Sequence, residues 1–168
     1  MADVCLILFH ITVFFLLIEI GHSQETNPRS AGASAPGHVI IGGIFPVHQA
    51  VEKSMMFEPH VWPCVRFGPK GLAKAVAMIN AIETMNKSPL LADINITLGY
   101  QIHDSCGDVT TGLRATADLI QQAICNRRTN ISSCEQPVIA VVGASYSEIS
   151  IAIARQLTLP MIPQCGHR

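Results

Sequence analysis

Residues 140–154, AVVGASYSEISIAIA, place a short apolar run, a glycine and a group of small hydroxyl residues directly before a helical pattern. The run in residues 138–142 is apolar and rich in β-branched side chains, as expected of a strand buried in a parallel sheet, and Gly143 permits a turn after it. Ser147 stands at the expected N-cap of the next helix. The apolar positions that predict this helix are Ile149, Ile153 and Leu157.

The corner between this strand and this helix favours a ligand with a negative charge, because a helix start presents unpaired N–H groups and the positive end of the helix dipole. A nucleophile elbow needs Gly-x-Ser-x-Gly, and Gly143-Ala144-Ser145-Tyr146-Ser147 has serine in place of the final glycine. A phosphate loop needs a second glycine followed by lysine, and the stretch has neither. A carboxylate or another small anion remains open, beside the simpler alternative that Ser147 only caps its own helix.

Strand and helix patterns alternate through the rest of the chain. The order β-α-β-α-β-α-β indicates an α/β fold with a parallel sheet, helices on both faces and ligands at the carboxyl ends of the strands. The predicted elements before the corner are a strand in residues 38–47, a helix in 71–85, a strand in 94–104 and a helix in 111–124, and residues 157–163 predict a last short strand. The expected buried helix faces are Leu72, Val76, Ile79 and Ile82 in the first helix and Leu113, Ala117, Ile120 and Ile124 in the second.

The N-terminus indicates secretion. Residues 6–18 are mostly apolar, and small residues precede a suitable cleavage point, so residues 1–23 are expected to be a signal peptide, with a retained anchor as the alternative. Residues 24–37 are polar, contain proline and glycine, and are expected to be a flexible leader. The remaining residues 38–168 suffice for one modest core. A formal net charge of −1 without a basic block argues against a nucleic-acid partner.

Two N-glycosylation sequons fit the secretory interpretation. Asn130 lies in a polar loop and is the better candidate, whereas Asn95 opens a predicted strand and is expected to be more shielded.

The cysteines are odd in number once Cys5 is removed with the signal peptide. His60 precedes Cys64 by four residues and His103 precedes Cys106 by three, a spacing compatible with a zinc site. An oxidising compartment and the absence of Cys-x-x-Cys favour a disulfide between Cys64 and Cys106 instead.

Three blocks of the sequence together resemble the start of the extracellular Venus-flytrap domain of class C G protein-coupled receptors. They are GHVIIGGIFPVH at residues 37–48, AMINAIETMNKSPLLADINITLGYQIHDSC at 77–106 and AVVGASYSEIS at 140–150. The likeness is greatest to the branch of the calcium-sensing receptor and the family C group 6 member A receptors of basic amino acids, and it covers residues 38–164. It implies lobe 1 of a type I periplasmic-binding-protein-like fold that closes on an L-α-amino acid, in a homodimer that signals to a heterotrimeric G protein.

The resemblance assigns roles to individual residues. Ser147 matches the family's serine that binds the α-carboxylate of the ligand, and Ser145, earlier in the turn, has a weaker claim. Lys70 matches a position near the ligand where several relatives carry a basic residue. The family's intralobe disulfide falls on Cys64 and Cys106. Among the remaining cysteines, Cys134 matches the position of an interchain disulfide in the family. The resemblance assigns no partner to Cys125 or Cys165.

The end of the chain departs from the family pattern, because relatives continue after Pro163-Gln164 with a ligand-contacting stretch and this chain ends in CGHR. We therefore expect an incomplete lobe 1 without lobe 2 and the transmembrane domain, on the extracellular side of the plasma membrane within a complete receptor and secreted as a fragment. Sensing of divalent cations is a further expectation; no cofactor or resident metal is implied. A soluble amino-acid-binding or decoy module is the alternative. An enzyme built on Ser145, His103 and Asp104 is the least favoured.

Overall fold

The computed structural model describes residues 32–52, 63–128 and 136–166. The predicted signal peptide lies outside these residues, as do His60, Asn130 and Cys134. Within the described ranges no helix has the length and apolarity needed to cross a bilayer.

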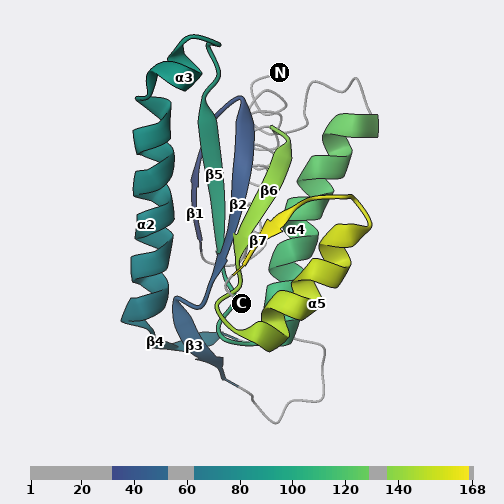
Figure 1. Ribbon diagram of the computed structural model, residues 1–168. Helices are drawn as coiled ribbons and strands as arrows, with labels where there is room; N and C mark the ends of the chain where they lie inside the picture. The colour runs from purple at the N-terminus through teal and green to yellow at the C-terminus, as the bar shows by residue number, and fades with distance from the viewer. Residues whose placement is uncertain (1–31, 53–62, 129–135, 167–168) are drawn as a thin grey trace, which may run out of the picture.

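A mostly parallel five-stranded sheet forms the centre of the described fold (Figure 1), with strand order β1-β5-β2-β6-β7. Strands β5, β2, β6 and β7 are parallel to one another, and β1 pairs with β5 in the antiparallel sense. The strands of this sheet are β1 (Gly32–Ala35), β2 (Val39–Phe45), β5 (Leu98–Asp104), β6 (Val138–Gly143) and β7 (Gln164–Cys165). A separate hairpin of β3 (His48–Val51) and β4 (Cys64–Phe67) follows the carboxyl end of β2. The predicted α/β fold with a parallel sheet is confirmed.

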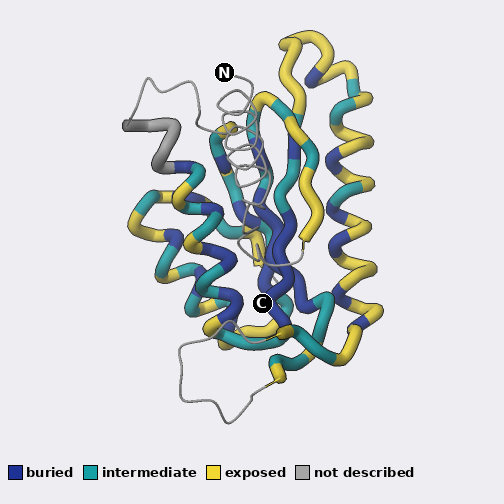
Figure 2. Tube along the Cα trace, turned by 180° about the vertical axis from the view of Figure 1, so that it is seen from behind, coloured by how far each residue is buried: buried dark blue, intermediate teal, exposed yellow. Residues whose placement is uncertain are grey.

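Helices cover both faces of the sheet. On one face α2 (Pro69–Asn86) packs against β2 and β5, and a short α3 (Pro89–Ala92) follows it. On the other face α4 (Val109–Arg128) and α5 (Ser147–Thr158) pack against β2 and β6 around the larger of two apolar clusters. Figure 2 shows the buried residues concentrated along the central strands and on the inner sides of these helices.

The chain enters the sheet earlier than the sequence analysis expects. Residues 32–35, placed in a flexible leader, form β1 and pair with residues 100–103 of β5. The sequence GASA has no large or β-branched side chain and is mostly exposed, so backbone pairing makes this edge strand and apolar periodicity does not reveal it.

The predicted inner faces of α2 and α4 are correct only in part. Ile82 is buried, and Ile79 and Ile120 pack against the two apolar clusters, but other predicted positions are exposed. In α2 the exposed fractions of Leu72 and Val76 are 42% and 45%. The buried residues of α2 are instead Gly71, Ala75, Met78 and Ile82. A Cβ at Gly71 would clash with the carbonyl of Pro46, so the helix approaches the β2 end closely on the glycine side, and Leu72 and Val76 are left exposed.

In α4 the buried side chains include two threonines rather than the expected Ala117, which is exposed. Thr116 donates to the Gly112 carbonyl at 2.8 Å and Thr111 donates to the Asp108 carboxylate at 3.1 Å. These local hydrogen bonds satisfy the hydroxyl groups, so the threonines can face the core. A pattern that counts only apolar letters therefore misplaces the face.

The α5 face is confirmed, because Ile149, Ile153 and Leu157 are at most 1% exposed. The predicted last strand in residues 157–163 is wrong: α5 continues to Thr158. The last paired residues are Gln164 and Cys165, which lie beside Val141 and Val142 of β6.

Candidate ligand-binding site

A cavity of about 310 Å³ lies where the carboxyl ends of β2 and β6 approach the start of α2. It is lined by Pro46, Gln49, Lys70, Gly71, Lys74, Ser145 and Tyr146. A second hollow of about 370 Å³ lies between α5 and β7, and no charged residue lines its described walls. The first cavity is the better candidate site, because it combines charged side chains with the edge of the sheet at which parallel α/β folds bind ligands.

Two lysines of α2 supply the positive charge of the cavity. Lys70 and Lys74 are one helical turn apart and therefore lie on the same side of the helix. Lys74 Nζ donates to Ser145 Oγ at 3.0 Å, which joins α2 to the turn after β6. Among the described residues that line the cavity there is no carboxylate, so the cavity is cationic.

The start of α5 differs from the expected one by one residue. Tyr146 is the N-cap, with φ −106° and ψ 135°, and its carbonyl accepts from the N–H of Ser150 at 2.9 Å. Ser147 is the first helical residue and is exposed. The interpretation of Ser147 as a helix cap is therefore wrong. Glu148, in the same first turn, offsets part of the positive helix dipole.

Contacts with β2 and with β7 fix the turn between β6 and α5. Gly143 has φ +119°, and a Cβ there would meet the carbonyl of Ile44, so only glycine fits. Gln164 Nε2 donates to the Gly143 carbonyl at 2.5 Å and to Ser150 Oγ at 3.1 Å. Gln164 was not predicted from the sequence, because its role depends on the position of the distant β7.

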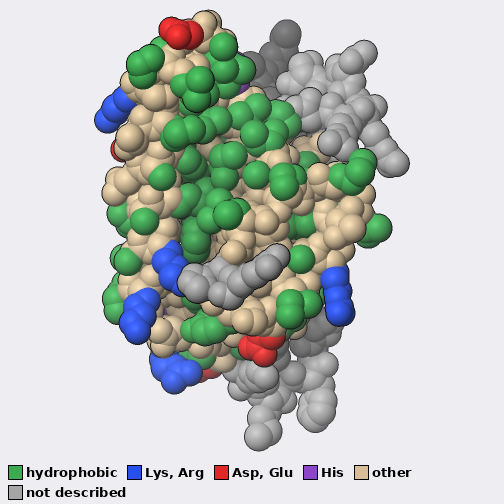
Figure 3. Space-filling model, viewed as in Figure 1, with side chains coloured by type: hydrophobic (Ala, Val, Ile, Leu, Met, Phe, Trp, Pro, Cys, Tyr) green, Lys and Arg blue, Asp and Glu red, His purple; other side chains and the backbone are tan. Residues whose placement is uncertain are grey.

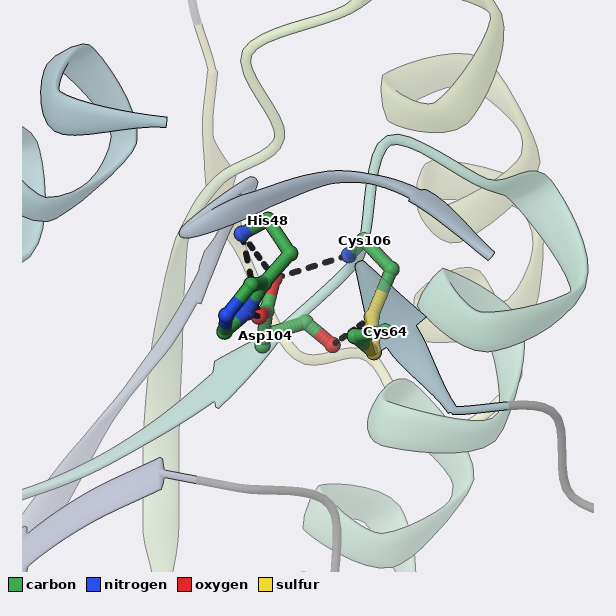
Figure 4. Close-up of polar contacts among 4 residues, drawn as sticks. All are labelled: His48, Cys64, Asp104 and Cys106. Atoms are coloured by element: carbon green, nitrogen blue, oxygen red, sulfur yellow. Dashed lines mark hydrogen bonds and ion pairs between the residues drawn. A yellow bond between two sulfur atoms is a disulfide. The ribbon is translucent and has the colours of Figure 1, made fainter. Parts of the chain in front are cut away.

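A buried carboxylate fixes the hairpin beside the cavity (Figure 4). Asp104, at the end of β5 and 2% exposed, accepts the backbone N–H of His48 at 3.1 and 3.2 Å and that of Cys106 at 2.8 Å. His48 Nδ1 also lies 2.5 Å from the Asp104 carboxylate. Cys64 and Cys106 form the disulfide that the resemblance implies, with Cα atoms 5.5 Å apart, which ties β4 to the turn after β5.

These contacts bear on two alternatives from the sequence. The zinc site is not supported, because the sulfur atoms of Cys64 and Cys106 are bonded to each other. The hydrolase set is not supported either, since His103 and Asp104 are neighbours in a strand and their side chains point to opposite faces. The Asp104 carboxylate is engaged by His48, and Ser145 accepts from Lys74.

Burial lowers the pKa of His103, and the Asp118 carboxylate opposes this in part.

The structure thus brings Ser145 and Lys70 to one cavity and places Ser147 immediately after it in the chain. Lys74 and Tyr146, which were not predicted from the sequence, also line this cavity. Lys74 could have been found from its spacing of four residues after Lys70. The free Cys165 is exposed.

Comparisons with known proteins agree with the resemblance. The family described as receptor family ligand binding region matches residues 73–167, more than half of the chain. The chain is 48% identical over 149 residues to the G-protein coupled receptor family C group 6 member A of Carassius auratus, which covers 84% of this chain and 17% of that protein. The human protein of the same name is 35% identical over 94% of this chain and 18% of its own length.

The human extracellular calcium-sensing receptor is 35% identical over 95% of the chain and 15% of its own length. The chain thus spans less than a fifth of the length of these relatives. It belongs to the receptor family ligand-binding region, in the branch carried by class C G protein-coupled receptors.

Proposed function

We propose that this chain supplies the lobe-1 side of an amino-acid-binding cleft in a class C receptor, and that the α-carboxylate of an L-α-amino acid binds between the start of α5 and the two lysines of α2. The observation that carries this proposal is the cationic cavity at the carboxyl ends of β2 and β6. Ser147, freed from helix capping, offers its exposed hydroxyl to the carboxylate, and the first N–H groups of α5 add further donors.

The lysines have separate parts in this proposal. Lys74 donates to Ser145, which orients the Ser145 hydroxyl and keeps a positive charge beside the turn. Lys70 lines the same cavity one helical turn away. A cation next to a carboxylate strengthens each hydrogen bond that the carboxylate accepts. The carboxylate is therefore the part of the ligand that this lobe recognises.

The same charges constrain the rest of the ligand. If the ligand is a basic amino acid, its cationic side chain must lie away from Lys70 and Lys74, because like charges at short range repel. We therefore place the side chain of a basic ligand toward a second lobe of a longer protein. The described residues beside the cavity offer no group of carboxylates for a divalent cation, so cation sensing is left to other parts of a complete receptor.

The receptor context is also part of the proposal. We place the chain on the extracellular side of the plasma membrane, in a homodimer bridged through Cys134, with signalling to a G protein through a transmembrane domain of the longer protein. Non-reducing electrophoresis of a complete ectodomain tests the bridge, because Cys134→Ser should abolish a covalent dimer.

A ligand panel tests the proposed function itself. A complete ectodomain containing this chain should bind L-arginine and L-alanine in titration calorimetry and should not bind the matching amino alcohols, which lack the carboxylate. Binding of L-alaninol with the affinity of L-alanine would contradict a carboxylate site. Binding of neither amino acid, by an ectodomain shown to be folded, would contradict the amino-acid assignment.

A further inference from the structure

Four exposed apolar side chains gather around the turn between α2 and β5, at the end of the sheet opposite the ligand cavity. The exposed fractions are 45% for Met85, 69% for Leu90, 58% for Ile94 and 38% for Ile96. We call these four residues the apolar cap. Hydrophobic side chains are visible on the surface around the end of the molecule that carries α3 (Figure 3).

The backbone under the apolar cap is well ordered by hydrogen bonds. The N–H groups of Asn95 and Ile96 donate to the carbonyls of Ala92 and Leu91 at 3.1 and 3.2 Å. The Asn86 side chain bonds to both backbone groups of Leu98, at 2.8 and 2.9 Å, and so joins the end of α2 to the start of β5. The cap is therefore held at the surface by a defined turn.

Asn95 lies between two residues of the cap. It is exposed and takes a left-handed conformation with φ 51°, which asparagine tolerates better than most residues. It opens the acceptor sequence Asn95-Ile96-Thr97. The expectation that Asn95 is shielded is wrong, because β5 begins only at Leu98 and Asn95 belongs to the turn before it.

We propose that Asn95 carries an N-linked glycan and that this glycan covers the apolar cap. Neighbouring exposed apolar side chains on a soluble domain usually meet a partner. A glycan attached between Ile94 and Ile96 is a covalent occupant of this surface, and its bulk would keep other proteins away from it. The inference needs only that the chain enters the secretory pathway, and it does not rest on the ligand proposed above.

The test compares Asn95→Gln with Asn130→Gln in the complete chain, expressed in a glycosylating secretory host. Each variant should lose one glycosidase-sensitive step in apparent mass. Only Asn95→Gln should raise the fluorescence of an apolar-surface dye and shift the protein toward larger species in size-exclusion chromatography. Asn130→Gln is the matched control for the loss of a glycan elsewhere in the chain.

A misfolded Asn95→Gln variant would also bind the dye, so a triple variant with Leu90→Gln and Ile94→Gln is added. Dye binding should return toward the wild-type level in the triple variant if the dye sits on the apolar cap. Three results would overturn the proposal: an unchanged mass in Asn95→Gln, a lost glycan with dye binding and size equal to those of Asn130→Gln, or no rescue in the triple variant.

Discussion

Replacing Ser147 by alanine tests whether the Ser147 hydroxyl contacts the ligand or caps the helix. A hydrogen bond from a hydroxyl to a charged group contributes about 1.5 to 3 kcal/mol. At tenfold per about 1.4 kcal/mol, its loss should lower amino-acid potency roughly 10- to 150-fold. Because Ser147 is exposed and is the first helical residue, the free energy of unfolding should change by no more than about 0.5 kcal/mol. An N-cap serine would instead cost about 0.5 to 2 kcal/mol of stability.

The assay uses a full-length receptor in which this chain replaces the matching segment of the Carassius auratus relative. Concentration–response curves for L-arginine and L-alanine give the potency, and surface labelling gives the amount of receptor at the membrane. Thermal melts of the ectodomain give the stability. Ser147→Thr keeps the hydroxyl and should keep most of the potency. Unchanged potency in Ser147→Ala at normal surface expression would refute the carboxylate site, and a potency loss matched by a fall in melting temperature would restore the structural role.

Three further predictions concern the charged residues around the cavity. Lys74→Met should lower amino-acid potency by roughly tenfold or more, because it removes a cation that strengthens hydrogen bonds to the carboxylate. Lys74→Arg and Ser145→Ala should each lower the potency less. Equal potency in Lys74→Met and wild type would argue against a cationic site. Asp104→Ala should lower the free energy of unfolding by about 1 to 3 kcal/mol in denaturant titrations, because it leaves buried N–H donors without an acceptor, and His48→Gln should cost less. The pKa of His103 is lowered in the folded state, so the unfolded chain binds more protons than the folded chain below about pH 6.5. The free energy of unfolding should therefore fall as the pH drops from 7 through the folded-state pKa. His103→Gln should flatten this part of the stability–pH curve.

The order of the parallel elements could be predicted from the sequence because strong local signals carry it. The β-branched run of β6 and the four-residue spacing of Ile149, Ile153 and Leu157 each fix one element without help from the rest of the chain. The rotation of α2 could not be predicted, because its alanines and methionines are compatible with several faces. Contact of Gly71 with Pro46, 25 residues earlier, selects the observed face.

The candidate site was partly predictable for the same reason. Ser145 and Ser147 belong to a local strand–turn–helix pattern, and Lys70 came from a resemblance. Gln164 and the pairing of Asp104 with His48 depend on contacts between segments far apart in the chain, for which one sequence carries no signal. The residues that support the site were therefore missed, whereas Ser145 and Lys70, which line the cavity, were among the predicted site residues.

The lysines of α2 are the strongest argument that the cavity binds a ligand, because they are unfavourable for the helix that carries them. Lys70 lies in the first turn, where the helix dipole disfavours positive charge, and the first turn holds no acidic residue to compensate. Lys70 and Lys74 also repel each other at a spacing of four residues, at a cost of about 0.2 to 0.5 kcal/mol. Departures from local preference of this kind are expected at functional sites. An anion bound in the cavity would offset both the repulsion between the two lysines and the unfavourable position of Lys70 in the helix dipole. It would also interact favourably with the positive ends of α2 and α5. On the proposed function, the two lysines of α2 therefore stabilise the lobe more when the cavity holds an anion, and the same difference favours the bound state.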